Sequence, residues 1–187
     1  MKPRHAQLAP REHTGLIIVD VQEAFRPAID AFDQMAARIG LLAEGFGLLG
    51  RPVLVTEQYP EKLGETVAEV AERLPAGVAP LPKTRFSAWG VPRVERALVD
   101  AGCRTWVICG LETHICVAQT ALDLLHAGYC AQVALDAVSS RTARDREIGI
   151  RKMTDAGVGA TCAESVLFEM LVDARADEFK AISRLVR

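Results

Sequence analysis

The sequence of 187 residues lacks the features of membrane-spanning and secreted proteins. It has no run approaching the roughly 18 uncharged apolar residues of a transmembrane helix, and residues 1–13 hold no apolar core of signal-peptide length. Its five cysteines make an odd number without a Cys-x-x-Cys pair, so reduced thiols are expected rather than a disulfide framework. We therefore expect a cytoplasmic protein that does not bind a membrane.

An excess of one charge and a cluster of histidines are also missing. The formal net charge is −2 with acidic and basic residues interspersed, so no basic face for nucleic acid stands out. The four histidines, His5, His13, His114 and His126, include no pair at the spacing of metal ligands on a helix. We predict no metal and no other cofactor, and a small molecule rather than a nucleic acid as the partner.

The apolar half of the sequence is arranged in alternating strand and helix patterns. Apolar runs of strand length lie at 15–19, 52–56, 105–109 and 131–135, with shorter candidates at 78–81 and 159–161. Amphipathic segments lie at 29–49, 66–74, 91–101, 116–126, 143–156 and 174–186. This order predicts one α/β domain over residues 1–187, a three-layer α/β/α sandwich whose mostly parallel sheet of about six strands has helices on both faces. Residues 1–13 are expected to form an extended N-terminal segment.

Polar residues follow the predicted strands, where the ligands of open parallel sheets bind. In chain order these residues are Asp20, Glu57 with Gln58, Lys83, Cys116 and Asp136. One edge of the sheet thus collects carboxylates, an ammonium and a thiol. Any single Asp after a strand is about as often a cap or turn former, so the prediction depends on their convergence.

Cys116 opens the predicted helix 116–126, directly after a strand and a tight turn. Amide dipoles at the start of a helix favour a thiolate, so we expect its pKa to lie below the usual ~8.5. Cys116 is therefore the candidate nucleophile. The other four thiols lie beside or within apolar runs, where core packing is the expected role.

Three motifs resemble those of the isochorismatase-like cysteine hydrolases in order and spacing. They are D-V-Q-E-A-F at 20–25, K-T-R-F-S-A-W at 83–89 and G-L-E-T-H-I-C-V at 110–117. The resemblance spans nearly the whole chain and implies the isochorismatase-like, Rossmann-like fold. The superfamily includes nicotinamidases and N-carbamoylsarcosine amidohydrolases. The segment T-E-Q-Y-P-E-K-L-G at 56–64 is similar to isochorismatase-domain proteins whose substrate is often unassigned.

The resemblance implies a role for each residue of the three motifs. Asp20 would act as general base and acid, Lys83 would hold the carboxylate and the thiolate, and Cys116 would attack an amide-type carbonyl. Water would then cleave the thioester. Backbone N–H groups of Glu112 and Cys116 would form the oxyanion hole, and the Leu111–Glu112 peptide bond aligns with a cis bond in the family. Related proteins are generally homo-oligomers, so a dimer or tetramer is expected.

Six further residues are predicted around the site. Gln22 and Thr113 are expected to orient Asp20 and the turn that carries the nucleophile. Phe25 and Trp89 would wall a small pocket, although core packing fits these aromatics equally well. Nicotinamidases carry metal-binding residues at the positions of Glu57 and Gln58, which here would contact the polar end of a substrate or form structural hydrogen bonds.

Three alternative functions accompany the amidohydrolase hypothesis. Vinyl ether hydrolysis of the isochorismatase type does not require a thiol, so Cys116 favours C–N bond cleavage. A redox-sensing or non-catalytic thiol protein would not require the full Asp, Lys and Cys set. A flavodoxin-like nucleotide-binding protein is disfavoured because the G-x-G-x-x-G at 45–50 ends a predicted helix instead of following a strand. His114 stands two residues before Cys116 and would point in another direction, which argues against a Cys-His dyad.

Overall fold

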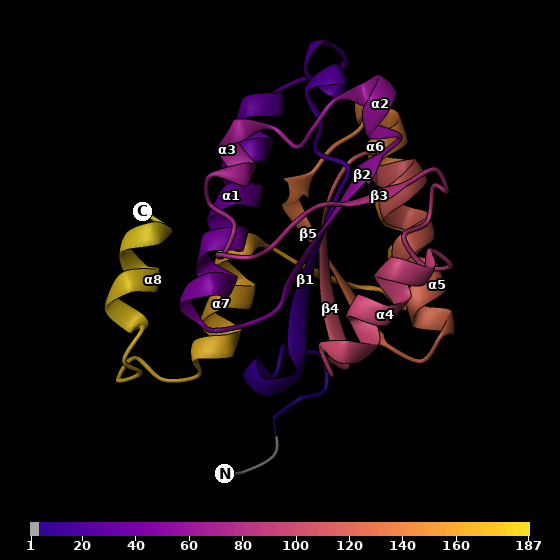
Figure 1. Ribbon diagram of the computed structural model, residues 1–187. Coiled ribbons are helices and arrows are strands. Elements are labelled where there is room, and N and C mark those ends of the chain that lie inside the picture. The colour runs from indigo at the N-terminus through magenta and orange to yellow at the C-terminus, as the bar shows by residue number, and fades with distance from the viewer. Residues whose placement is uncertain (1–3) are drawn as a thin grey trace.

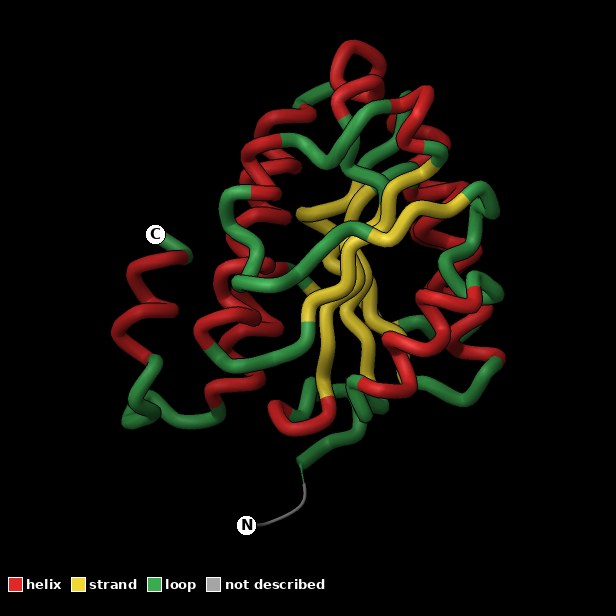
Figure 2. Tube along the Cα trace, in the orientation of Figure 1, coloured by secondary structure: helices red, strands yellow, loops and turns green. Residues whose placement is uncertain are grey.

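The computed structural model describes residues 4–187 and contains one six-stranded parallel sheet (Figures 1 and 2). The strand order is β3-β2-β1-β4-β5-β6, and each neighbouring pair is parallel. The strands are β1 Thr14–Val19, β2 Val53–Gln58, β3 Leu81–Lys83, β4 Thr105–Gly110, β5 Cys130–Val138 and β6 Gly159–Thr161. The predicted single-domain α/β fold is therefore confirmed.

Helices cover both faces of the sheet, which Figure 2 shows in yellow between two red layers. In Figure 1, one layer holds α1 Phe32–Leu48, α3 Ala68–Ala71, α7 Ala163–Leu171 and α8 Phe179–Leu185. The opposite layer holds α4 Pro92–Asp100, α5 Ala118–His126 and α6 Ala143–Asp155, and the short α2 Pro60–Leu63 lies near the carboxyl ends of the strands. None of the helices in residues 4–187 is long and apolar enough to cross a membrane.

The central strands are buried because their side chains enter two separate cores. In β1, Leu16 and Ile18 belong to the apolar cluster under α1 and α7, whereas Ile17 and Val19 belong to the cluster under α4 and α5. Successive side chains of a strand point to opposite faces, so a strand covered on both sides needs apolar residues throughout. This explains why continuous apolar runs identified the strands correctly.

Several predicted boundaries were wrong. The strand expected at 78–81 is β3, Leu81–Lys83, because only these residues pair with the end of β2. The helix expected at 66–74 is reduced to α3, and the one expected at 174–186 is reduced to α8. Helix α7 was not predicted, although its buried residues follow helical spacing: Ala163, Val166, Leu167, Met170 and Leu171. The N-terminal segment is extended only in part, because Arg11–His13 forms a 3-10 helix.

The direction of winding changes between β1 and β4. From β1 the chain builds the sheet outward through β2 to β3, and it then returns to place β4 on the other side of β1. At this point Gly110 has φ +112°, and a Cβ there would lie 2.0 Å from the carbonyl oxygen of Val19. The two strand ends thus meet at the position where doubly wound sheets bind ligands.

Candidate active site

Asp20 follows β1 directly and turns its carboxylate into the protein. Its φ of 54° lies in the left-handed region, which Asp adopts more readily than most residues. Asp20 Oδ1 accepts a hydrogen bond of 2.8 Å from Thr56 Oγ1, and Oδ2 lies 2.6 Å from Lys83 Nζ. The side chains of Asp20 and Lys83 are both 0% exposed, so this is a fully buried ion pair.

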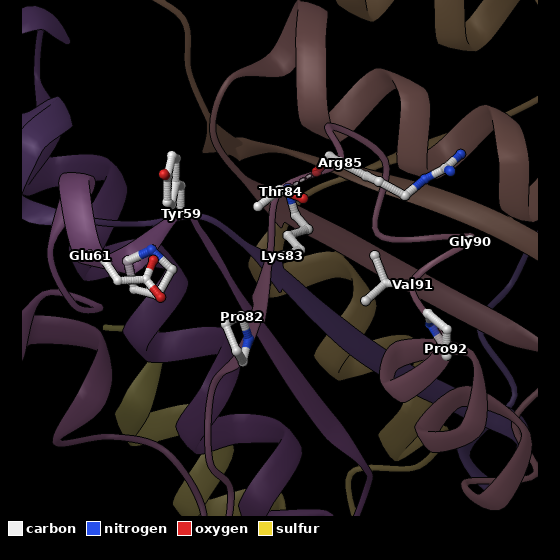
Figure 3. Close-up of a pocket in the computed structure, with 10 residues that line it drawn as sticks. Tyr59, Glu61, Pro82, Lys83, Thr84, Arg85, Gly90, Val91 and Pro92 are labelled. Atoms are coloured by element: carbon white, nitrogen blue, oxygen red, sulfur yellow. Dashed lines mark hydrogen bonds between the residues drawn. The ribbon is translucent and has the colours of Figure 1, made fainter.

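Lys83 is the last residue of β3, and its ammonium is surrounded by oxygen atoms. Besides Asp20, Nζ lies 2.7 Å from Gln58 Oε1 and 3.0 Å from the carbonyl oxygens of Arg85 and Phe86. Figure 3 shows the Lys83 side chain and its bond to Arg85 O as a dashed line. An ammonium has three N–H groups, so these four acceptors satisfy it fully and fix its position.

Cys116 lies in a π-helical turn, Thr113–Val117, that joins β4 to α5 and is called here the Cys116 turn. The prediction that Cys116 opens α5 was wrong, because the helix begins at Ala118, whose N–H donates to Thr113 O five residues back. Such turns are frequent at functional sites. Cys116 is 7% exposed, and its thiol and the Asp20 carboxylate each shift the pKa of the other, as expected for neighbouring groups. The structure thus brings Asp20, Lys83 and Cys116 together.

The electrostatics of the thiol differ from expectation. Burial is the largest effect and, with the negative charge of Asp20, raises the pKa of Cys116 to about 12, although Lys83 opposes the change. The lowered pKa expected from the sequence is therefore wrong. The reason is that the Lys83 charge is already matched by Asp20, while the surrounding protein excludes water from the sulfur. Burial also raises the pKa of Asp20, against the effect of Lys83.

Residues 112–114 are tied to residues 139–141, in the loop that follows β5. The N–H and Oγ1 of Thr113 both donate to Ser139 O at 2.8 Å, and His114 Nδ1 lies 3.0 Å from Ser140 Oγ. Arg141 donates to Glu112 Oε2 from its backbone N at 3.1 Å and from Nε at 3.0 Å. These bonds position the Cys116 turn. The His114 ring is held by its hydrogen bond with Ser140.

The peptide bond between Leu111 and Glu112 is cis. Glu112 is 6% exposed, and within residues 4–187 its N–H donates to no protein acceptor. An amide that is unpaired in this way is available to an oxygen atom of a ligand. Its position four residues before the thiol is the one expected for an oxyanion donor.

The predicted polar supporting residues mainly hold the ends of β1, β2 and β3 together. Gln22 Nε2 donates to Gln58 O at 3.0 Å and to Gly64 O at 2.6 Å, while Gln22 Oε1 accepts from Gln58 N at 2.8 Å. Glu57 Oε1 accepts from the N–H and Oγ1 of Thr66 at 2.6 and 2.7 Å. Gln58 contacts Lys83, so it orients the ammonium, whereas Gln22 and Glu57 fix the loop that contains Thr66.

The two predicted aromatics are half-buried against opposite cores. Phe25 lies in a 3-10 helix, Glu23–Ala28, and packs against the core under α1. Trp89 packs against the other core and meets Tyr129 edge to face with ring centroids 5.9 Å apart. These contacts show packing roles for both residues.

Three expectations for single residues outside the site were wrong. Asp136 does not follow a strand end, because β5 continues to Val138, and its exposed Oδ1 accepts from Ala163 N at 2.9 Å, at the start of α7. Cys130 is exposed and Cys162 is half-buried, so these thiols are not core residues. Burial was predicted correctly for Cys103 and Cys109.

Sequence reasoning missed two residues that support the site. Thr56 was assigned only to a strand, yet its hydroxyl orients Asp20. Gly149 of α6 packs so closely that a Cβ there would lie 2.8 Å from the Cα of His114. A signal for Thr56 existed, because a hydroxyl at the end of a buried strand next to a carboxylate requires a partner. The contact of Gly149 has no signal in the sequence.

A cavity of about 350 Å³ lies beside Lys83, with Tyr59, Glu61 and Arg85 in its lining (Figure 3). Asp20 and Cys116 are not among its lining residues. Within residues 4–187, no group of three or more His, Cys, Asp or Glu side chains is arranged to hold a metal ion.

Known proteins share both the sequence and the fold. The sequence model of the isochorismatase domain matches residues 14–165. The chain is 40% identical over 169 residues to isochorismatase domain-containing protein 1 of Danio rerio, a match that covers 90% of this chain and 59% of that protein. The chain thus spans about three fifths of that relative's length.

Two solved structures show the likeness of fold. The structure described as MAR1 ribonuclease from Caenorhabditis elegans has a TM-score of 0.91 at 32% identity, covering 95% of this chain and 91% of that chain. The YcaC gene product of Escherichia coli, described as an octameric hydrolase of unknown specificity, has a TM-score of 0.89 at 20% identity, covering 99% and 91%. At that identity the second match shows the fold alone.

Proposed function

This chain belongs to the isochorismatase family, and from that premise we propose that it is a cysteine hydrolase that cleaves the C–N bond of a small amide-type substrate. Family members are generally hydrolases. The single observation that carries the proposal is the fully buried ion pair of Asp20 with Lys83, whose two charges both act on the Cys116 thiol.

In the first step Asp20 takes the thiol proton as the sulfur attacks the carbonyl carbon. The raised pKa of Cys116 makes this base necessary, because few free thiolates exist at neutral pH. Lys83 keeps the carboxylate in place and stabilises the negative charge that develops on the sulfur. The Glu112 and Cys116 N–H groups stabilise the oxyanion, where one donor typically contributes ~3 kcal/mol.

In the second step Asp20 returns its proton to the departing amine, which leaves a thioester on Cys116. Asp20 then takes a proton from water as the water attacks the thioester carbonyl, and it gives this proton to the sulfur as the C–S bond breaks, which releases the acid and restores the free thiol. A buried carboxylate with an elevated pKa suits a group that gives up and accepts a proton in turn.

The burial of the site supports a small substrate. Cys116, Lys83 and Asp20 are 7%, 4% and 0% exposed, so a polymer has little access to them. Ribonuclease activity, which the C. elegans relative's description names, is not favoured here for that reason and because the net charge is −2. The redox-sensor alternative requires a low-pKa thiol, and burial has the opposite effect.

We further propose that the protein is a single hydrolase domain over 1–187 that requires no cofactor and acts in the cytoplasm as a homo-oligomer. Support for the assembly comes from YcaC, which shares the fold and is described as octameric. Gln58 serves the reaction by orienting Lys83, while Gln22, Glu57 and Thr113 support the site through the bonds described above.

An ammonia-release screen over small carboxamides, carbamoyl and ureido compounds tests the function. We expect wild type to release ammonia from at least one class and Cys116→Ala to release none. The matched control is Cys130→Ala, which removes an exposed thiol outside the site and should retain full activity. Equal release by wild type and Cys116→Ala would reject the proposed nucleophile.

A further inference from the structure

The Glu112 side chain has an unused oxygen atom. Its Oε2 accepts both hydrogen bonds from Arg141, whereas Oε1 makes no hydrogen bond within residues 4–187. Oε1 is not sealed from solvent. The buried Glu112 side chain therefore keeps one partly accessible carboxylate oxygen that has no hydrogen-bond partner.

The position of this oxygen is restricted by the backbone. A Glu carboxylate lies within roughly 5 Å of its own Cα. The backbone N–H of the same residue is the proposed oxyanion donor, so one residue supplies both the donor and the carboxylate. The Glu112 charge also contributes, after burial and Asp20, to the raised pKa of the Cys116 thiol.

The charges around the site do not cancel equally. Asp20 and Lys83 neutralise each other in a buried pair. The Arg141 side chain is 58% exposed and screened by water, while Glu112 is 6% exposed. The field at the thiol therefore keeps a negative component from Glu112.

We propose that the Glu112 carboxylate is a specificity determinant that receives a hydrogen-bond donor of the substrate. The inference rests on the proposed hydrolase function and narrows its substrate class. Preferred substrates carry an N–H donor or a positive charge close to the scissile amide, as in amino-acid amides, guanidino or ureido compounds. Amides with a carboxylate at that position are rejected, because it would face Oε1 without a proton between them.

A purely structural role for Glu112, as a tether for residues 139–141, explains less. Thr113 and His114 already make three hydrogen bonds to Ser139 and Ser140. An amide oxygen could also accept from Arg141, although more weakly, and it would avoid the cost of burying a charge. The tether alone therefore does not require an acid at position 112.

The test uses charged thiol reagents and requires no turnover. Methanethiosulfonates carrying trimethylammonium or sulfonate react with the thiol to give a mixed disulfide and methanesulfinic acid. We would measure the modification rates of Cys116 in a Cys130→Ser, Cys162→Ser background, which removes the two thiols that are not buried. The ratio of the cationic rate to the anionic rate reports the field, because a change in thiol pKa affects both rates equally.

We expect Glu112→Gln to lower this ratio by at least about fivefold, the effect of one charge at ~8 Å even in water-like dielectric. Glu112→Asp should keep the ratio near that of the wild type, and Arg141→Ala should raise it. The matched control Glu164→Gln, at an exposed position of α7, should leave the ratio unchanged. If Glu112→Gln fails to fold, the rate ratio measured for Arg141→Ala tests the proposal in its place.

A ratio that is the same in wild type, Glu112→Gln and Arg141→Ala would overturn the proposal and leave Glu112 as a tether. This outcome is distinct from failure of the hydrolase function, which would appear as ammonia release that does not depend on Cys116. With an active amide in hand, cationic and anionic derivatives of it should show the same preference in kcat/KM.

Discussion

Replacing Asp20 with Asn should change turnover and thiol reactivity in opposite directions. Asn keeps the shape of the side chain and can still accept from Lys83, but it cannot take a proton. Loss of a general base typically lowers kcat by 10²–10⁴-fold. The same change removes the negative charge that, with burial, holds the Cys116 pKa at about 12.

The size of the second effect follows from the geometry of the pair. Two unit charges ~4 Å apart interact by about 4 kcal/mol at an effective dielectric of 20, which corresponds to about three pKa units. The Cys116 pKa should therefore fall from about 12 toward 9.0, the value of a thiol in water. A thiolate of lower pKa is a weaker nucleophile, with a Brønsted slope near 0.5, so the net gain in alkylation rate at pH 8 is roughly 30-fold.

Lys83 remains held in this variant. It loses its carboxylate but keeps Gln58 Oε1 and the carbonyl oxygens of Arg85 and Phe86. Removing one member of a buried ion pair typically costs about 3–5 kcal/mol in the free energy of unfolding. The loss here should lie at or below the lower end of that range.

The assay is the pH dependence of iodoacetamide modification of Cys116, followed on the peptide by mass spectrometry, alongside ammonia release on the best substrate. Asp136→Asn is the control, since that carboxylate is exposed and bonds to the start of α7. Alkylation of Asp20→Asn that is slower than wild type, or turnover that survives, would refute the assignment of Asp20 as the base.

Two further predictions concern packing and pH. Gly149→Ala should lower the free energy of unfolding by about 1–3 kcal/mol and reduce kcat, because the added Cβ would lie 2.8 Å from His114 Cα. Urea denaturation measures the first effect. The control is Gly47→Ala in α1, where the added Cβ would make a milder contact of 3.1 Å. The folded chain retains the Cys116 proton up to about pH 12, whereas the unfolded chain loses it near 9, so stability should fall as pH rises between these values. The slope due to this thiol is about 1.4 kcal/mol per pH unit, and Cys116→Ser should lack it; parallel curves for both proteins would contradict the raised pKa.

The strands of this fold were predictable because the sheet is buried on both faces. The apolar runs of β1, β2 and β4 have no alternation, and their carboxyl ends had to meet at one edge. The ends of β3 and β5 were missed, because they depend on pairing with neighbours and not on apolarity. Helix α7 was missed, although its apolar residues recur at the spacing of an amphipathic helix.

The sequence by itself determined the parallel α/β architecture and the order in which Asp20, Lys83 and Cys116 follow their strands. It did so because the burial of a strand and the alternation of strands with helices can be predicted from residue type and spacing within short stretches of the chain. Only the tertiary structure decided the state of the site: a thiol of raised pKa, an ammonium surrounded by four oxygens, and a Glu112 carboxylate held through one atom. These properties arise from desolvation and from contacts between distant segments, which no single stretch of the chain contains.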